Sequence, residues 1–489
     1  MTAKKWLLMI AVVSLIVFSP KTTSAASAPY ESYNYNYWEE AVPSPAPYVP
    51  IRSISGTDLG IGDFVEPSDM YVADSGVVYI LDSGNHRIVC LDAKLNVIRI
   101  IDSFEVEGVK NVFNNPSGIF ANNEGNIYIA DTDNQRIVVL SPDGDYINII
   151  KEPKSDILPD DFTFVPLKLT VDKANRVYVV SRGVFEGIVQ FDDKGKFIGY
   201  VGTNKIERNV VDYFWRLVST KAQKQQMELF IPTEFSNVDI DYKGFVYATN
   251  IDPDSKEPIK RLNPSGEDVL KRIGYFDVMG DIRYSIFGGN AGPSKFIDIK
   301  VREGGMYSAL DSLRGRIFTY DDEGNLLYIF GAKGTQLGTF KTPVAIEFLN
   351  ETLVVLDRGK SNIILYEPTL FGSSVNEAVR HHYEGEDSEA VNSWKQVLQL
   401  NSNYDIAYIG IGKSLVMEKK NEEALEYFEA GMDRKHYSVA YKRHRREVMK
   451  DVLGPFLSLL MVLILGIVIY KLWKKRKTRR AERREAGFH

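Results

Sequence analysis

Five oxygen-bearing side chains recur at matching places along this sequence. Each one ends a run of β-branched and aromatic residues, and the five are Asp82, Asp131, Asn250, Asp311 and Asp357. Carboxylate and amide oxygens are ligands that calcium accepts, so these residues are candidates for a metal site. The competing interpretation is structural, because the same side chains can accept hydrogen bonds from loop amides and pair with Arg87, Arg136 or Arg316 within one unit. We expect the structural role and leave calcium open.

Other catalytic chemistry is poorly supported. The chain has six histidines, of which only His86 lies among the repeated units, so a three-histidine zinc site is excluded there. The adjacent His381 and His382 lie on a predicted helix and cannot face one ion together. The single cysteine, Cys90, lies in a predicted buried strand and cannot form an internal disulfide. No Ser-His-Asp arrangement or glycine-rich phosphate loop is evident, so the sequence leans away from an enzyme.

A repeated unit positions these side chains. Six prolines mark its copies at steps of 49, 50, 66, 61 and 50 residues, and they are Pro67, Pro116, Pro166, Pro232, Pro293 and Pro343. Each copy predicts four short strands. Glycine turns, which favour φ > 0, separate the third and fourth strands at Asp143-Gly144, Lys194-Gly195, Ser265-Gly266 and Glu323-Gly324. Short strands repeated in this way predict a mainly β fold, a six-bladed β-propeller over residues 51–370.

The sixth copy predicts closure of the ring. It offers three strands, near Val344–Phe348, Leu353–Leu356 and Asn362–Tyr366, and then loses the pattern. The segment Ile51–Ser55 at the start of the repeats can supply the missing outer strand. Joining the two ends of the array removes a free sheet edge. We therefore predict six closed blades rather than an open array.

The motifs within the units are similar to a known repeat. The second copy contains Pro116-Ser117-Gly118, then Gly125-Asn126-Ile127-Tyr128-Ile129, then Asp131, Asn134 and Arg136. The first copy keeps Asp82, Asn85 and Arg87, and the fifth keeps Asp311 and Arg316. These units resemble the NHL repeat. The third, fourth and sixth copies depart at the loop, where they have Ser181, Asn250 and Lys360-Ser361-Asn362.

The resemblance implies two enzymatic relatives. Amidating lyases built on NHL propellers hold zinc with several histidines, which this chain lacks. Lactonase-like six-bladed propellers bind calcium through Glu, Asn and Asp side chains on the central axis. A calcium-dependent lactonase or hydrolase is therefore the alternative function. Three or more carboxylates converging on the axis would favour it, and an aliphatic axis would remove it.

Two joints between blades are longer than the others, at 205–230 and 270–292. Both should emerge on the face that carries the Asp-Xaa-Xaa-Asn loops. The first has apolar residues at helical spacing and the second is rich in glycine and aromatic residues. Their large side chains Phe214, Trp215, Tyr284 and Phe287 are candidates for binding a partner, and inert packing on the rim is the alternative.

Residues 371–450 change to a helical pattern. Ala390 and Ala424 are 34 residues apart, as are Trp394 and Phe428. This period resembles tetratricopeptide repeats, which implies a groove for a peptide or protein. Trp394 and Tyr408 are the candidate partner-binding residues there. A rigid spacer is the alternative.

The two ends predict the topology. Lys4 and Lys5 precede an apolar run and small residues, so residues 1–26 are expected to be a signal peptide, followed by a Tyr/Pro-rich linker at 27–50. Residues 453–470 are uncharged and long enough to span a bilayer. The basic tail 471–489 should lie in the cytoplasm, against anionic lipid. The remaining body has a net charge of −16, which argues against nucleic acid.

Together these features predict a single-pass protein of the cell membrane with its body outside the cytoplasm. The expected function is a binding or scaffold module that recognises a protein or glycan through the propeller face. Resemblance to membrane-anchored bacterial NHL proteins implies an accessory role in an envelope or carbohydrate-uptake system.

Overall fold

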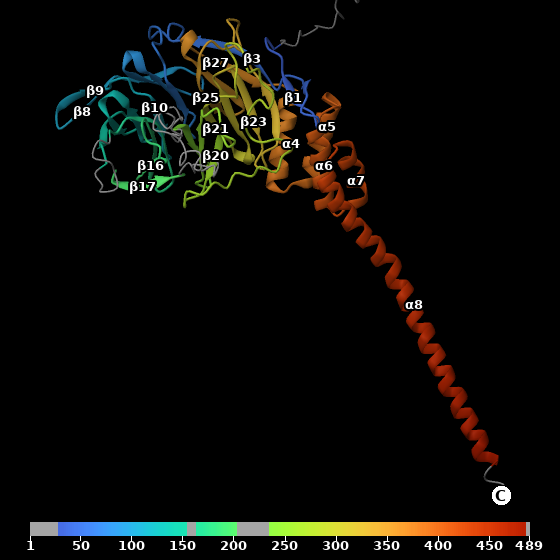
Figure 1. The fold of residues 1–489 in the computed structure, drawn as a ribbon. Helices are drawn as coiled ribbons and strands as arrows, with labels where there is room; N and C mark the ends of the chain where they lie inside the picture. Colours follow the sequence, from blue (N-terminus) through green and yellow to red (C-terminus); the bar gives the residue numbers. More distant parts are fainter. Residues whose placement is uncertain (1–27, 154–162, 203–233, 486–489) are drawn as a thin grey trace, which may run out of the picture. The chain divides into compact units, whose positions relative to one another are not determined.

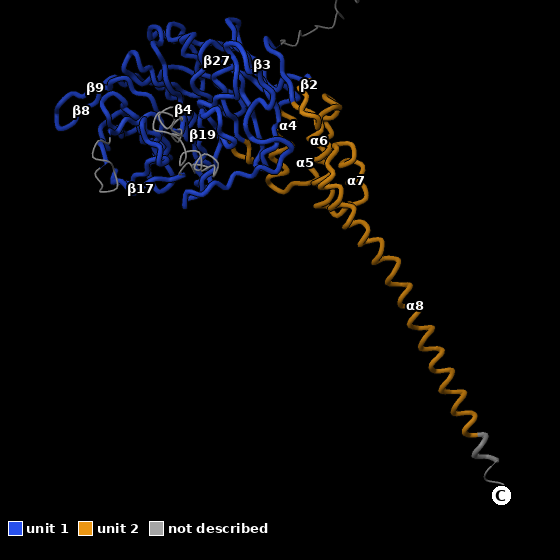
Figure 2. The backbone as a smooth tube through the Cα atoms, in the orientation of Figure 1, with its two compact units in different colours: residues 1–34, 43–301, 307–372 blue, residues 35–42, 302–306, 373–489 orange. Residues whose placement is uncertain are grey.

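The computed structural model describes residues 28–153, 163–202 and 234–485. It divides into two compact units, shown in Figure 2. The first comprises residues 1–34, 43–301 and 307–372, and the second comprises residues 35–42, 302–306 and 373–489.

The first unit is a six-bladed β-propeller, with the strands placed as in Figure 1. Blade 1 contains β4 (Asp69–Val72), β5 (Val78–Asp82), β6 (Arg87–Leu91) and β7 (Val97–Ile101). Blade 2 contains β10 (Gly118–Ala121), β11 (Ile127–Asp131), β12 (Arg136–Leu140) and β13 (Tyr146–Ile150). Blade 3 contains β14 (Pro166–Val171), β15 (Val177–Ser181), β16 (Ile188–Phe191) and β17 (Phe197–Val201). All are antiparallel meanders with the first strand innermost.

The remaining blades vary this plan. Blade 4 contains β18 (Phe235–Ile240), β19 (Val246–Asn250) and β20 (Ile259–Leu262). Blade 5 contains β21 (Phe296–Val301), β22 (Tyr307–Asp311), β23 (Arg316–Tyr320) and β24 (Leu326–Phe330), extended outward by β1 (Tyr33–Tyr35) and β2 (Ala41–Pro43). Blade 6 contains β25 (Pro343–Leu349), β26 (Thr352–Asp357), β27 (Asn362–Pro368) and β3 (Tyr48–Ser55).

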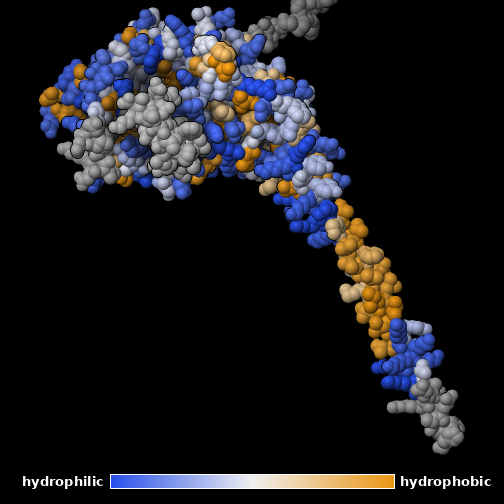
Figure 3. Space-filling model, viewed as in Figure 1, coloured by the Kyte–Doolittle hydropathy of each residue, from blue (hydrophilic) through white to orange (hydrophobic). Residues whose placement is uncertain are grey.

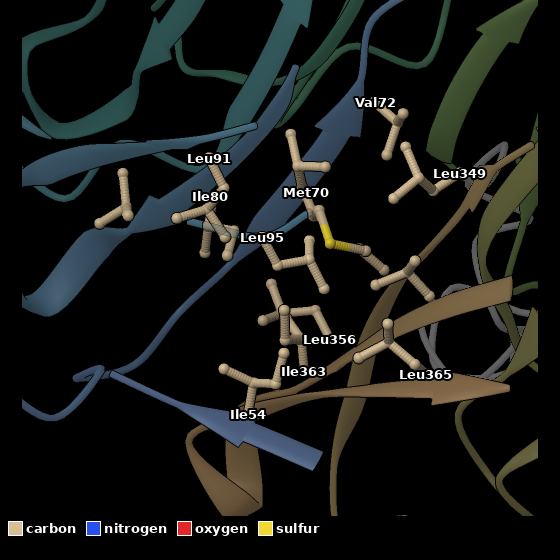
Figure 4. Packing of buried hydrophobic residues seen from close by; sticks show 14 of the residues in the cluster. Ile54, Met70, Val72, Ile80, Leu91, Leu95, Leu349, Leu356, Ile363 and Leu365 are labelled. Carbon is tan, nitrogen blue, oxygen red and sulfur yellow. The ribbon is translucent and has the colours of Figure 1, made fainter. Parts of the chain in front are cut away.

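The predicted ring closure is confirmed. Strand β3 pairs with β27 in the register Ile54↔Ile363 and Ser53↔Ile364. Ile54 is fully buried, and Figure 4 places it beside Leu356 and Ile363 in the core between blades 6 and 1. The predicted turn glycines also hold, since Gly144 and Gly324 have φ of 92° and 87°.

Three expectations about strands need correction. Blade 4 was expected to have four strands, but after β20 the returning chain forms an isolated bridge, Leu262↔Asp268, and a bond from Val269 N–H to Arg261 O at 2.7 Å. It then reaches blade 5, where Ile273 N–H donates to Glu323 O at 3.0 Å. Residues 27–50 are not a plain linker, since they contribute to β1, β2 and β3 and bury Tyr30, Tyr35 and Tyr48. A hairpin of β8 (Ser103–Val106) and β9 (Val109–Val112) in the joint between blades 1 and 2 was not predicted.

The second unit is helical. It contains α4 (Leu370–Glu384), α5 (Asp387–Leu400), α6 (Asp405–Met417), α7 (Asn421–Ala430) and α8 (Arg434–Glu485), apart from the first three residues of α4. Two glycines of α6 allow close packing: a Cβ on Gly410 would lie 2.3 Å from the indole Nε1 of Trp394, and one on Gly412 would lie 2.6 Å from the ring of Phe428. Each period-related aromatic residue therefore packs against a glycine of α6.

The last helix contains the predicted span. Residues 453–470 lie inside α8, whose stretch Arg434–Arg480 is long and apolar enough to cross a membrane. Figure 3 shows an apolar band on this helix, followed by a hydrophilic segment.

The ring closure yields a stability prediction. We expect Ile54→Ala to lower the free energy of unfolding by about 2–5 kcal/mol, because it leaves a cavity in a closed core. The control, Ile51→Ala, removes a 44% exposed side chain from the same strand and should change stability by less than about 0.5 kcal/mol. Denaturant unfolding of the detergent-solubilised chain measures both values. Equal effects would argue against closure by β3.

Candidate functional site

The Asp-Xaa-Xaa-Asn-Xaa-Arg motif forms a hydrogen-bonded loop within each of the first two blades. The carboxylate of Asp82 accepts bonds from Val65 N–H at 2.7 Å, Asn85 Nδ2 at 2.8 Å and Arg87 Nε at 2.7 Å. Asp131 repeats this pattern with Asn114 N–H, Asn134 Nδ2 and Arg136 Nε at 2.7, 2.9 and 2.8 Å. Both carboxylates are fully buried, so three donors replace the water they lose.

The other three recurring residues are held in the same way by different donors. Asp357 accepts bonds from the backbone N–H groups of Lys341, Thr342 and Gly359. The side chain of Asn250 accepts a bond from Asp252 N–H at 3.2 Å and donates to the Glu257 carbonyl at 3.2 Å.

Asp311 accepts from Lys295 and Leu313 N–H and lies 3.5 Å from Arg314 Nη1. The expected Arg316 pairing is wrong, because Arg316 binds Asp281 at 2.5 Å.

The five residues occupy five different blades and do not form one group. Within the part of the chain that the structure describes, no three His, Cys, Asp or Glu side chains are grouped so as to hold a metal ion. Each of the five serves its own loop instead. Their arrangement supports the structural interpretation and gives calcium no shared position.

A second set of polar side chains, which sequence reasoning missed, lies on the propeller axis. These residues occupy the innermost strands at positions i and i+2, which point to one face of a strand. The first axial layer consists of Asp69, Lys168, Asn237 and Asp298, and the second axial layer consists of Tyr71, Asp239, Lys300 and Glu347.

The contacts of these residues cross the ring. Lys168 of blade 3 binds Asp69 of blade 1 at 2.5 Å, and the ammonium of Lys300 in blade 5 lies 4.9 Å from the ring centre of Tyr71 in blade 1. Blades 1 and 3, like blades 5 and 1, are not neighbours in the ring, so these contacts pass through its centre. The axis is filled by side chains that bind one another.

In the first axial layer, the carboxylates also bind strand backbones. Asp69 accepts from Ile119 N–H of blade 2 at 2.9 Å. Asp298 accepts from Asn237 Nδ2 of blade 4 and from Ile346 N–H of blade 6, the latter at 2.5 Å. Each carboxylate therefore joins several blades.

In the second axial layer, one lysine serves two carboxylates. Lys300 Nζ lies 3.0 Å from Glu347 Oε1 and 3.8 Å from Asp239 Oδ1. Asp239 also accepts from Val301 N–H at 2.8 Å. The aromatic ring of Tyr71 packs against Phe120 of blade 2, with the ring centres 4.5 Å apart.

Burial sets the charge of the axis. It raises the pKa of Asp298 to about 8, and it raises the pKa of Glu347 to about 8 against the opposing effect of Lys300. Burial also raises the pKa of Asp69, which Lys168 opposes. Although burial disfavours its charge, the carboxylates of Asp239 and Glu347 raise the pKa of Lys300. The raised pKa values of Asp298 and Glu347 favour protonated carboxyls beside the two axial lysines.

The number of carboxylates on the axis meets the criterion that would favour a lactonase. Their contacts do not favour one, because these carboxylates bind other groups of the same chain. Four carboxylates converge there, yet each one is bound to a lysine, an amide or a backbone N–H. A signal for this axis was present in the sequence: the inner strands alternate polar and apolar residues, as in Asp69-Met70-Tyr71, Asn237-Val238-Asp239 and Asp298-Ile299-Lys300.

The joint between blades 4 and 5 has a base that is held by hydrogen bonds and a tip that is exposed. Asp281 is buried at the base and binds Arg316, Arg314 and the Tyr33 hydroxyl. Gly280 N–H binds the Tyr320 hydroxyl at 3.0 Å, and Arg314 donates to the carbonyls of Asn290 and Gly292. These bonds place the joint against the loop between β22 and β23, on the face where it was expected.

The candidate partner-binding residues fall in different environments. At the tip, Phe287 and Ile286 are 80% and 73% exposed, and Tyr284 is 39% exposed. Tyr408 donates its hydroxyl to the Ser402 carbonyl at 3.1 Å, and Trp394 is buried in the helical core. Phe214 and Trp215 lie outside the described residues.

Comparison with known proteins identifies the repeat. The model of the NHL repeat family matches residues 64–91 and 113–140. The chain contains NHL repeats. These matches cover the first three strands of blades 1 and 2, in which the Asp-Xaa-Xaa-Asn-Xaa-Arg motif is complete. No curated protein sequence matches this chain.

Solved structures are similar to this chain at low identity. Virginiamycin B lyase from Staphylococcus aureus is 12% identical with a TM-score of 0.40, over 65% of this chain and 98% of its own. A protein of unknown function from Bacteroides thetaiotaomicron is 12% identical with a TM-score of 0.43, over 68% and 80%. A gluconolactonase-like protein is 12% identical with a TM-score of 0.41, over 70% and 98%.

The raised pKa of Glu347 predicts a pH-dependent stability. The native state keeps this proton up to about pH 8, whereas the unfolded chain releases it near 4.5, so stability falls as pH rises between these values. The slope for one group is at most about 1.4 kcal/mol per pH unit. Glu347→Gln keeps the acceptor for Lys300, so it should flatten the profile and be more stable than the parent at pH 8.

Thermal unfolding of the solubilised chain from pH 5 to pH 8 measures this effect. The control, Asp143→Asn, alters an exposed carboxylate paired with Arg99 and should give a profile parallel to that of the parent. A Glu347→Gln profile as steep as the parent's would show that Glu347 is ionised in the native state.

The occupied axis predicts that calcium is not an integral component. We expect the full chain, purified without chelator, to contain no stoichiometric calcium by elemental analysis. Its melting temperature should not change on adding EDTA, because binding to the native state alone would stabilise it. If the chain contains one calcium ion, and if its removal by EDTA lowers the melting temperature by several degrees, the result would support the lactonase alternative.

Proposed function

We propose that this chain is a membrane-anchored binding module whose propeller captures a protein or glycan partner outside the cytoplasm. The observation that carries the proposal is the exposed pair Ile286 and Phe287 on a loop with a buried, hydrogen-bonded base. Clustered exposed apolar side chains mark interaction sites, and a fixed base lowers the entropy cost of binding.

The filled axis supports recognition at the surface. Substrate sites are usually concave pockets with a few convergent polar groups. Here the convergent groups of the axis bind one another, and Asp69, Asp298 and Glu347 are each less than 10% exposed. A partner is therefore more readily held by the loop that carries Ile286 and Phe287 than by the axis.

The ends of the chain suggest how the module is attached. An apolar helix that can span a bilayer is followed by nine lysines and arginines between residues 471 and 489. A cytoplasmic tail of this charge would bind anionic lipid headgroups. With a signal peptide at residues 1–26, the propeller would lie on the outer side of the cell membrane, as an accessory of an envelope or carbohydrate-uptake system.

We propose that helices α4 to α7 are tetratricopeptide-like repeats. Their support is the period of 34 residues, at which Ala390 and Ala424 are fully buried and Trp394 and Phe428 are 3% and 1% exposed. Such a pair of repeats would dock a second protein or hold the propeller at a fixed distance from the membrane.

A pull-down tests the binding function. The chain, tagged at its tail, is purified from detergent-solubilised membranes, and bound proteins and glycans are identified by mass spectrometry. We expect a partner that is depleted at least about tenfold by the double variant Ile286→Ser and Phe287→Ser.

The matched control is Tyr242→Ser, which removes a 48% exposed aromatic side chain from the turn between β18 and β19, at the opposite ends of the strands. This control should retain the partner. Recovery of no partner from the parent chain, or equal recovery with the loop variant, would count against the proposed function.

A further inference from the structure

The outer strands of blades 1, 2, 3 and 5 share one construction. In each of them a bulge follows the same turn, opposite Cys90/Leu91, Val139/Leu140, Gln190/Phe191 and Thr319/Tyr320. The bulge brings one residue of each outer strand to an equivalent position. These residues are Ile98 in β7, Ile147 in β13, Ile198 in β17 and Leu327 in β24.

Equivalent positions have opposite exposure. Leu327 in blade 5 is fully buried, whereas Ile98, Ile147 and Ile198 are 53%, 46% and 51% exposed. Two residues further on, Ile329 is fully buried and Ile100 is 39% exposed. Three adjacent blades thus expose the apolar residues that a fourth blade buries.

Blade 5 shows what such an edge can bind. Strand β1 adds to the outer edge of β24, with Tyr33 opposite Ile329. Asn34 Nδ2 donates to the carbonyls of Leu327 at 3.0 Å and Leu326 at 3.4 Å. An extended segment that alternates tyrosine with asparagine therefore recognises this edge within the chain itself. In the described residues, β7 and β13 are the last strands of their sheets.

The hairpin between blades 1 and 2 extends the exposed apolar surface. Phe104 of β8 stacks on Tyr146 of β13 with ring centres 6.4 Å apart. At the other strand of the hairpin, Val109 and Val112 are 64% and 54% exposed, and Figure 3 shows apolar surface at this hairpin. An exposed apolar edge of this kind favours strand addition by another chain.

We propose that the outer edges of β7 and β13 bind an extended segment of a partner protein by strand addition. The segment alternates aromatic and polar residues, as Tyr33-Asn34-Tyr35 does. Main-chain hydrogen bonds to the edge provide affinity, and the isoleucines at 98, 100 and 147 select alternating aromatic side chains. This inference rests on the proposed binding function but assigns the partner to the rim rather than to the loop that carries Phe287.

The probe is a fluorescent peptide with the sequence of residues 31–37, measured by anisotropy against the full chain in detergent. A peptide of equal composition with its three tyrosines adjacent is the control ligand. We expect the alternating peptide to bind and the double variant Ile98→Lys and Ile147→Lys to weaken it at least about tenfold. Tyr242→Lys, at an exposed site away from the rim, should leave binding unchanged.

A photo-crosslinker at the position of Tyr33 identifies the bound site. Crosslinks to Ile100 or to residues of β13 support the proposal. No binding, equal binding of the two peptides, or crosslinks to β24 or to helices α5 to α7 would overturn it. Self-association of the parent chain that the double variant abolishes would also overturn it, because a second copy would then occupy the rim.

Near-UV circular dichroism confirms that the variants fold, and Ile100→Lys alone, at a 39% exposed position of β7, is the reserve variant. The double variant at Ile286 and Phe287 should still bind the peptide. If no peptide binds at β7 and β13, the proposed binding at the loop of Ile286 and Phe287 is unaffected. If the loop binds no partner, the proposed strand addition is likewise unaffected.

Discussion

Six innermost strands present one edge each to the centre of the ring, and the backbone groups on those edges need hydrogen-bond partners. Buried N–H and C=O groups without partners are costly. Axial carboxylates accept bonds from Ile119, Val301 and Ile346 N–H. Hydroxyls of Ser68, Ser117 and Ser236 donate to carbonyls in or just before the inner strand of the next blade, at 2.7–3.0 Å.

This constraint explains why charged residues occupy the centre of the propeller. A buried carboxylate that accepts backbone bonds must itself be neutralised, by a lysine from across the ring or by a proton. Lys168 provides the first solution for Asp69 from across the ring, and the raised pKa values of Asp298 and Glu347 favour the second. The loop tip and the rim, where we propose that partners bind, expose apolar side chains.

Local patterns predicted much of the fold. Proline spacing, turn glycines and the Asp-Xaa-Xaa-Asn-Xaa-Arg motif act within one blade, so their geometry can be inferred from a short stretch of sequence. The axis is different, because Lys168 and Asp69 are 99 residues apart and meet only after the ring closes. Arg316 was assigned to Asp311 for the same reason, since its partner Asp281 belongs to an irregular joint. The segment of β1 was predicted to be a linker, because it becomes a strand only by pairing with β24, which is distant in the sequence.

The account depends most directly on the axis being filled and hydrogen-bonded. Hydrogen exchange of the full chain in detergent, resolved to single amides, measures this property. The account predicts that the N–H groups of Ile119, Val301 and Ile346 exchange as slowly as amides paired between strands of the same blade, because axial carboxylates hold them. Exchange as fast as that of the exposed turns would indicate a water-filled channel and would contradict it.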